Sequence, residues 1–221
     1  MSELITFTGS SSVDDSIITS HRINEIVNRR SQPLSIDLES TRVEDFSDLS
    51  SVTANVIVIS DPVKPEQSYK FVRSEALNKI DTDLFPMSSL RPFLEDAFID
   101  GRFLGGQNIL GFDFPVMMND ETLDVKDVIQ AFIDTRQVID TSKYIKDRYN
   151  FRVSLKYMAA GSIGGEKLMD GANAPIEWER GNYQDVIDYC VQDTVLWSDI
   201  HRYGVENGYI NIGGPKLAVD W

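Results

Sequence analysis

After residue 30, the hydrophobic residues of the sequence first fall into three short, strand-like runs. Segments 34–39, 54–60 and 69–73 are rich in Val, Ile and aromatic residues, and turn-forming residues such as "DPVKPEQ" separate the last two runs. Because no helical pattern stands between the runs, they predict three consecutive antiparallel strands that form a meander.

Beyond the meander, helical and strand patterns alternate. The stretch "SSLRPFLEDAFIDG" predicts a helix that Ser88 or Ser89 caps and that stops at Gly101. Segments 102–109 and 137–141 each predict a further strand, with helical patterns between and after them. This order of elements is typical of an α/β protein with a mixed sheet.

The clearest helical pattern is the last long one, "GNYQDVIDYCVQDTVLWSDIHRYGVENG". We expect this helix to begin with Asn182 as its N-cap, because Asp185 stands three residues later in the capping-box position. Glycine favours the left-handed conformation that commonly ends a helix, so we expect the end near Gly204 or Gly208.

Length and composition indicate one globular domain in a reducing compartment. At 221 residues, the chain is long enough for one substantial domain, which we assign to 31–221, with 1–30 as an N-terminal extension of unknown role. The single cysteine, Cys190, excludes an internal disulfide. Without a long apolar run or a leader-like start, the sequence predicts a soluble, cytoplasmic protein with no membrane partner.

The charge of the chain is strongly negative but uneven. A net charge of −14 disfavours tight, metal-free binding to duplex nucleic acid and is compatible with a site for divalent cations. One segment is instead basic, with the residues Lys143, Lys146, Arg148, Arg152 and Lys156. Aromatic residues are interleaved with them, and cations beside flat rings suit single-stranded nucleic acid. The alternative is a solvated helix face whose aromatic rings enter the core.

Two acids interrupt the first strand, "LSIDLEST". Successive strand side chains alternate between faces, so Asp37 and Glu39 should point the same way, ~6–7 Å apart. Acids are depleted in strands, and neighbouring carboxylates repel each other. This pair therefore needs either a cation or water.

A third acid, Asp113, stands between Phe112 and Phe114 in "GQNILGFDFPVM". Such a position is unusual for an acid that simply faces solvent. The alternative is that Asp113 caps a helix that begins at the next residues. Both interpretations can hold, since an acid at a helix start is also well placed to bind a metal.

The long helix carries the last candidates. Tyr189 and Asp193 are one turn apart and share a face, and Asp193 stands among apolar residues. An exposed acid that bonds to solvent or to an arginine is the alternative. Taken together, four carboxylates form a set of hard oxygen ligands of the kind that Mg²⁺ and Mn²⁺ prefer.

The ordered set of these residues resembles the three exonuclease motifs of the DEDD superfamily, tyrosine subclass: Asp37-Leu38-Glu39, Asn108 to Pro115, and Tyr189 to Asp193. The second and third motifs are most similar to the proofreading domains of family-B DNA polymerases and to related stand-alone predicted exonucleases. The resemblance spans about residues 34–209. It implies a ribonuclease-H-like sheet, with the three-strand meander plus two parallel strands and flanking helices. It also implies 3′–5′ exonuclease activity on single-stranded DNA or RNA ends, with DNA favoured.

The same resemblance implies roles for individual residues. Two divalent cations, Mg²⁺ or Mn²⁺, would be bound by the acids of the motifs, Asp37, Glu39, Asp113 and Asp193. Tyr189 would orient the attacking water, because a phenol with a pKa of ~10 is a poor base at neutral pH. Asn108 would steady the substrate strand or the loop that bears Asp113, and Phe112 beside it would contact substrate or pack.

Lys143, Lys146, Arg148 and Arg152 would contact the phosphates of the strand as its 3′ end approaches the metals. Three alternatives stay open: a catalytically silent nucleic-acid-binding module, a subunit that docks onto a polymerase or helicase, and an endonuclease of the same fold. Proofreading, repair and RNA trimming are equally compatible with the sequence.

Overall fold

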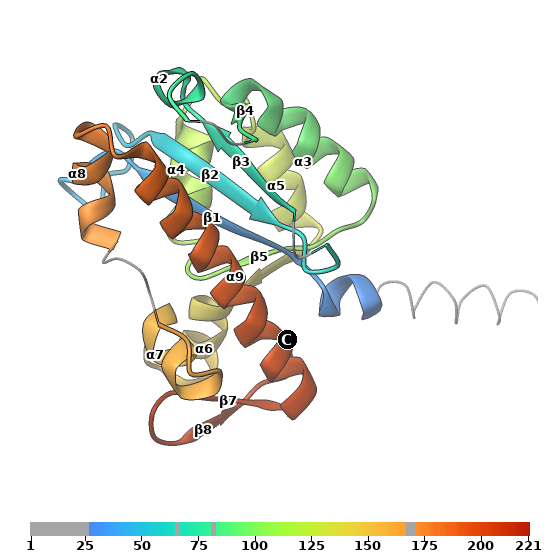
Figure 1. Ribbon diagram of the computed structural model, residues 1–221. Helices are drawn as coiled ribbons and strands as arrows, with labels where there is room; N and C mark the ends of the chain where they lie inside the picture. Colours follow the sequence, from blue (N-terminus) through green and yellow to red (C-terminus); the bar gives the residue numbers. More distant parts are fainter. Residues whose placement is uncertain (1–26, 65–66, 81–82, 167–170) are drawn as a thin grey trace, which may run out of the picture.

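A six-stranded mixed sheet in the order β4-β3-β2-β1-β5-β6 forms the centre of the protein (Figure 1). The computed structural model describes residues 27–64, 67–80, 83–166 and 171–221. The strands are β1 (Leu34–Ser40), β2 (Ala54–Ser60), β3 (Ser68–Val72), β4 (Phe85–Pro86), β5 (Leu104–Gly106) and β6 (Val138–Asp140). The α/β class and the mixed sheet predicted from the sequence are confirmed.

The strand directions divide the sheet into an antiparallel and a parallel part. β1, β2 and β3 pair antiparallel in sequence order, as the predicted meander requires. β5 pairs parallel to β1, and β6 parallel to β5. The carboxyl ends of β1, β5 and β6 therefore meet at the same edge of the sheet. The two-residue strand β4, which sequence patterns did not predict, adds a parallel partner to β3.

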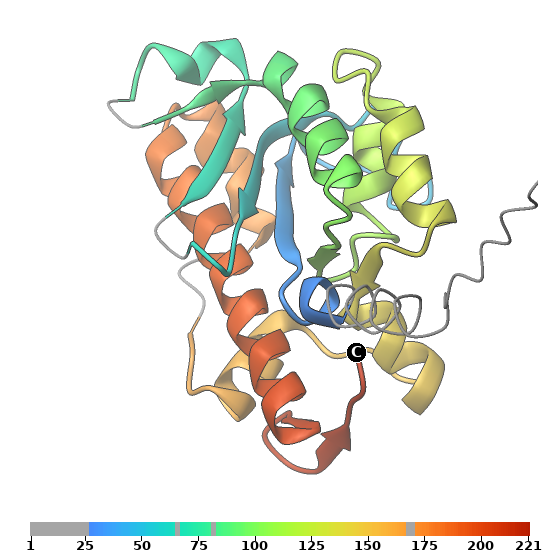
Figure 2. The ribbon, with the colours of Figure 1, turned by 90° about the vertical axis from the view of Figure 1, so that its right-hand side faces the viewer.

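Helices cover both faces of the sheet, so the domain has three layers (Figure 2). One face carries α8 (Ala174–Glu179) and α9 (Tyr183–Asn207), and the other carries α3 (Leu90–Ile99), α4 (Asp113–Asn119) and α5 (Lys126–Asp134). Ile36 and Leu38 of β1 pack against α3, α4 and α5. Because strand side chains alternate, Asp37 and Glu39 point to the α9 face.

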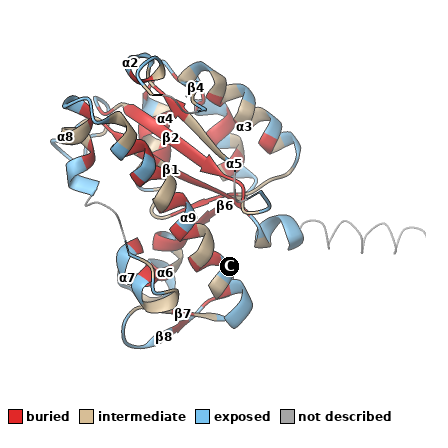
Figure 3. Cartoon of the chain, viewed as in Figure 1, coloured by how far each residue is buried: buried red, intermediate tan, exposed pale blue. Residues whose placement is uncertain are grey.

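A second core lies beyond the end of the sheet. It joins α6 (Thr141–Tyr149), α7 (Leu155–Ser162), the second half of α9 and a hairpin of β7 (Tyr209–Asn211) and β8 (Lys216–Ala218). Within it, His201 is stacked between Trp197 and Trp221, with ring centroids 5.1 and 5.9 Å away. Figure 3 shows that burial is concentrated in the central strands and the inner faces of the helices. The hairpin was not predicted from the sequence.

The predicted helix ends are only partly correct. A short helix, α2 (Ser74–Leu77), and a 3-10 turn (Met87–Ser89) precede α3, and Ser89 makes no capping hydrogen bond through its side chain. Asn182 is the N-cap of α9 by position, but its side chain donates to Glu177 instead, 2.5 Å away, so the predicted capping box is absent. The end of α9 at Gly208, with a left-handed φ of 72°, is as expected.

The extension assigned to 1–30 lies outside the described residues except for 27–30, which belong to a short exposed helix. Another short turn, a 3-10 helix at Gly171–Asn173, leads into α8. Among the described residues, no helix combines the length and the apolar character that crossing a membrane requires.

Burial of His201 predicts a pH-dependent stability. Burial lowers the pKa of His201 to about 4, and its Nε2 has no hydrogen-bond partner among the described residues. Between pH 6.5 and 4 the unfolded chain binds a proton that the folded protein rejects, so the free energy of unfolding falls as pH falls, by up to about 1.4 kcal/mol per pH unit. His201→Phe should keep the ring stack and flatten this slope.

Urea unfolding of both proteins at pH 7, 6 and 5 measures the effect. The difference between the two proteins isolates His201 from the carboxylates, which titrate equally in both. Parallel stability curves across this pH range would contradict the assignment.

Candidate functional site

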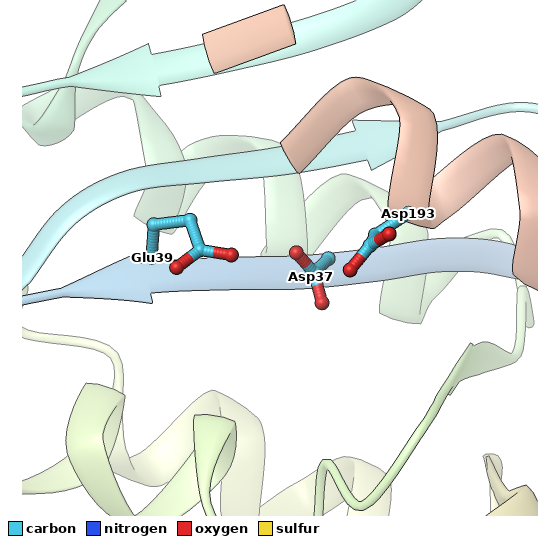
Figure 4. Close-up of side chains that lie close together, drawn as sticks. All are labelled: Asp37, Glu39 and Asp193. Atoms are coloured by element: carbon cyan, nitrogen blue, oxygen red, sulfur yellow. The ribbon is translucent and has the colours of Figure 1, made fainter. Parts of the chain in front are cut away.

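Three acids that are distant in the sequence meet on the α9 face of the sheet. Asp37 and Glu39 come from β1 and Asp193 comes from the middle of α9, and one carboxylate oxygen of each lies within 4.8 Å of the others. In the view of Figure 4, Glu39 and Asp193 lie on either side of Asp37. Asp193 is buried, whereas the two strand acids are half-buried. The structure therefore brings together three of the four acids that the sequence analysis singled out.

Three hydrogen bonds between small side chains of α9 and of the strands β1 and β2 fix the helix against the sheet at this point. The Cys190 thiol donates to Oδ2 of Asp37 at 3.3 Å, and four residues later the Thr194 hydroxyl bonds to that of Ser60 at 2.7 Å. Four residues further on, the Ser198 hydroxyl donates to that of Ser35 at 2.9 Å. Residues spaced by four share one helix face, so these bonds set the rotation of α9 and with it the direction of Asp193.

Asp113 is buried at the first position of α4, beside the strand acids but outside the group of three. The backbone of Asp113 itself and that of Leu38, which lies between Asp37 and Glu39 in β1, stabilise its charged form and so partly oppose a rise of its pKa. Burial, followed by the charge of Asp37, raises the pKa of Asp113 well above its usual range. Phe112 occupies the N-cap position of α4, so the interpretation of Asp113 as the cap residue is wrong.

Tyr189 lies one helical turn before Asp193 and is almost completely buried. Burial, together with the charges of Asp193 and Glu39, raises the pKa of the phenol, and its hydroxyl is hydrogen-bonded to Asp193. A Cβ atom at Gly171 would lie 3.3 Å from this hydroxyl, so the chain before α8 passes close to it. Tyr189 is therefore a neutral hydrogen-bonding group beside the acids.

The loop between β5 and α4 has a defined conformation around Asn108. Asn108 adopts a left-handed φ of 64°, and its carbonyl accepts the N–H groups of Gly111 and Phe112. Its side chain lies against Gly111, where a Cβ atom would come within 2.6 Å of Oδ1. Of the two roles expected for Asn108, the structure shows the one in which it steadies the loop that leads to Asp113.

The basic segment of the sequence divides between two environments. A cavity of about 190 Å³ is lined by residues of the Asn108 loop and of α6 and its C-terminal flank, including Asn108, Asp140, Lys143, Lys146 and Arg152. Arg148 lies apart from it and is bonded to the Tyr144 hydroxyl and to Asp220. Three of the four basic residues expected to contact phosphates therefore share one cavity, and Arg148 does not.

An aromatic pair of one exposed and one half-buried ring lies next to Asp113. Phe46, in the connection between β1 and β2, is 76% exposed, and its ring centroid lies 6.1 Å from that of Phe112. Phe112 directly precedes Asp113. The sequence analysis did not single out Phe46, because its contact with Phe112 bridges 66 positions of the chain. The sequence feature that could have identified Phe46 is that it is an aromatic residue in an otherwise polar loop.

No model of a known protein family matches the sequence, and no curated protein matches it. What the site does must therefore be argued from its own residues. Three clustered carboxylates, a fourth at their edge and a neutral phenol form an all-oxygen donor set, which fits a hard divalent cation such as Mg²⁺ or Mn²⁺.

Because the acids repel one another, removing one of them should raise the free energy of unfolding of the metal-free protein. The same removal should abolish the stabilisation by a bound metal ion. Asp37→Asn should stabilise the metal-free protein, because a charge is lost while an oxygen still accepts from Cys190. Mn²⁺ should stabilise the native protein, by about 2.7 kcal/mol at a hundred times its Kd, but not the variant. Thermal unfolding with and without Mn²⁺ measures both effects.

Asp188→Asn is the matched control, since Asp188 is an exposed acid on the same helix, bonded to Gln184. It should leave the effect of Mn²⁺ unchanged. Equal stabilisation of native protein and Asp37→Asn by Mn²⁺ would exclude a metal site at this cluster.

Proposed function

We propose that the protein is a metal-dependent 3′–5′ exonuclease of the DEDD superfamily, tyrosine subclass. It would hydrolyse phosphodiester bonds from the 3′ end of single-stranded nucleic acid, with DNA favoured, and release nucleoside 5′-monophosphates. The observation that carries the proposal is the meeting of Asp37, Glu39 and Asp193 on one face of the sheet. The strand order β3-β2-β1-β5-β6, with its antiparallel and parallel parts, is compatible with a ribonuclease-H-like fold and supports it.

The resemblance to the DEDD superfamily implies two ions at these acids. Asp37 lies between the other two clustered acids in Figure 4, and its charge also reaches Asp113. Asp37, Glu39, Asp193 and Asp113 would hold the ions through their carboxylate oxygens, the ligands that Mg²⁺ and Mn²⁺ prefer. Two Mg²⁺ or Mn²⁺ ions bound there would lower the pKa of a bound water and stabilise the departing oxygen of the phosphodiester.

Tyr189 would orient the attacking water rather than take its proton. The phenol is neutral because burial and the neighbouring acids raise its pKa, so it has a proton to donate and little tendency to act as a base. Its hydrogen bond to Asp193 fixes the hydroxyl beside one of the ligands. The phenol oxygen can accept a hydrogen bond from the water while its own O–H donates to Asp193.

Two features around the acids fit a single strand. The cavity lined by Lys143, Lys146 and Arg152 offers cations to the phosphates, next to the loop that carries Asp113. The exposed ring of Phe46, held against Phe112, offers a surface on which a base can stack. Both features are independent of base identity, which suits an enzyme that removes any terminal nucleotide.

The second candidate is a catalytically silent module of the same fold that binds nucleic acid or docks onto a polymerase or helicase. It is less well supported, because Asp37, Glu39, Asp113, Tyr189 and Asp193 are all retained. Buried and crowded acids are unfavourable unless they bind something, so a module without turnover would be stabilised by losing them.

A 5′-labelled single strand tests the activity. With Mg²⁺ or Mn²⁺, we expect stepwise shortening from the 3′ end, on DNA and RNA compared side by side. Asp37→Ala and Asp113→Ala should each reduce the rate by several orders of magnitude, because each removes a ligand. Tyr189→Phe should reduce it less, by about 10- to 100-fold, as expected for a group that acts on a ligand or on water.

Asp188→Asn again controls for an acid lost from the same helix, and it should keep full activity. Internal cuts would indicate an endonuclease, and retention of the strand without cleavage would indicate the silent module. Full activity of Asp113→Ala would show that the assignment of the ligands is wrong.

The basic cavity makes a separate prediction about binding. Lys146→Glu combined with Arg152→Glu should weaken binding of a single strand, and the dependence of log Kd on log salt concentration should become shallower, because fewer counterions are released. Fluorescence anisotropy at several salt concentrations, in Ca²⁺ to suppress cleavage, measures both quantities.

Arg202→Glu is the control for a charge reversal outside the cavity. Arg202 lies on α9, nine residues beyond Asp193, and pairs with Asp199. If reversal at Arg202 weakened binding as much as reversal in the cavity, the effect would come from overall charge, and the cavity would not be the phosphate contact.

A further inference from the structure

One buried carboxylate ties together three segments near the candidate site. Asp140, at the end of β6, is only 7% exposed. Its Oδ1 accepts the backbone N–H groups of Asn108 and Lys143, each at 3.0 Å, and its Oδ2 accepts that of Leu110 at 2.9 Å. Asp140 is thus both the N-cap of α6 and the anchor of the loop between β5 and α4.

The anchored loop leads directly to Asp113. Beyond Asn108 and Leu110, the loop is closed by hydrogen bonds from Gly111 and Phe112 to the Asn108 carbonyl, and the Phe114 N–H bonds to the Ile109 carbonyl. α4 begins at Asp113, between Phe112 and Phe114. No freely rotating segment therefore separates the groups bound by Asp140 from the carboxylate beside Asp37.

A second set of hydrogen bonds, around Gln107 and Thr141, connects the same loop to α6 and α9. The Gln107 side chain donates to the Val153 carbonyl at 2.7 Å and accepts from the Thr141 hydroxyl. The indole N–H of Trp197 on α9 donates to that hydroxyl at 3.1 Å. The start of the loop and the first residue after Asp140 are therefore connected to the helix that carries Asp193.

Only a carboxylate meets the demands of this position. Three backbone N–H groups converge on Asp140, and an ionised carboxylate has two oxygens that accept from several donors at once. An amide side chain offers one oxygen, and its NH₂ group would face an N–H donor. Hydrogen bonds to an ionised acceptor are also the stronger ones. These bonds hold Asn108 in its left-handed conformation.

We propose that Asp140 is a positioning residue of the reaction, because it holds the Asn108–Phe112 loop so that Asp113 lies beside Asp37. This inference rests on the proposed exonuclease function. Asp140 also lines the cavity of Lys146 and Arg152, but its three hydrogen bonds go to backbone N–H groups, so in this role it acts through the backbone of the loop.

The test compares Asp140→Asn and Asp140→Ala with the native protein. On a labelled single strand with saturating Mn²⁺, kcat should fall about 10- to 100-fold for Asp140→Asn and further for Asp140→Ala, since the amide keeps one acceptor. Backbone amide exchange at 108–114 should accelerate in both variants, while exchange in β1 stays slow. The Asn variant keeps the test valid if the Ala variant does not fold.

Asp61 provides the matched control. It is also a buried aspartate that anchors a loop, because it accepts the Val63 N–H at 3.0 Å and pairs with Arg102 at 2.9 Å. Asp61 follows β2, which runs antiparallel to β1, so it lies at the opposite end of the sheet from the end of β6. Asp61→Asn should lower stability comparably and leave kcat within about twofold of the native value.

Equal losses of kcat in Asp61→Asn and Asp140→Asn would overturn the positioning role, as would unchanged amide exchange at 108–114. An active native protein with fully active Asp140 variants would overturn this inference alone. An inactive native protein would overturn the proposed function and, with it, the catalytic part of this role.

Discussion

The mutual repulsion of carboxylates on β1 and α9 is the constraint around which the site is built. Asp37 and Glu39 cannot turn away from Asp193, because Ile36 and Leu38 between and beside them are buried in the core against α3, α4 and α5. A slip of one residue in the pairing of β1 would put the acids into that core. The energy of hydrophobic packing on one face thus holds unfavourable charges in place on the other.

Close approach of the layers explains how α9 reaches the acids. In β5, a Cβ atom at Gly105 would lie 2.0 Å from the Trp197 ring, and one at Gly106 would lie 2.6 Å from the Ile36 carbonyl. Side chains at these positions would push α9 and β1 away from β5. Gly105 therefore allows the long helix to lie directly on the sheet, where the hydrogen bonds of α9 to Ser35 and Ser60 can form, and Gly106 allows β1 to lie close to β5.

The parts of the site that follow from local geometry were predictable from the sequence. Alternation along a strand places Asp37 with Glu39, and helical spacing places Tyr189 with Asp193. Contacts between distant residues were not predictable: the bonds of Asp140 to the Asn108 loop, the pairing of Phe46 with Phe112, and the turn of Arg148 toward Asp220 all depend on tertiary packing. The predicted capping box of α9 was also wrong, because the side chain of Asn182 bonds to Glu177 instead of to the first turn of the helix.

The charge distribution is compatible with the proposed dependence on metal. The net charge of −14 and the three clustered acids repel phosphates, whereas Lys146 and Arg152 in the cavity next to the Asn108 loop attract them. Divalent cations bound by the acids would reverse the sign of the local field, so metal and strand would bind cooperatively. Neutral residues in place of Asp37 or Asp193 would remove part of this repulsion, so a module that only holds a strand would gain affinity from such replacements.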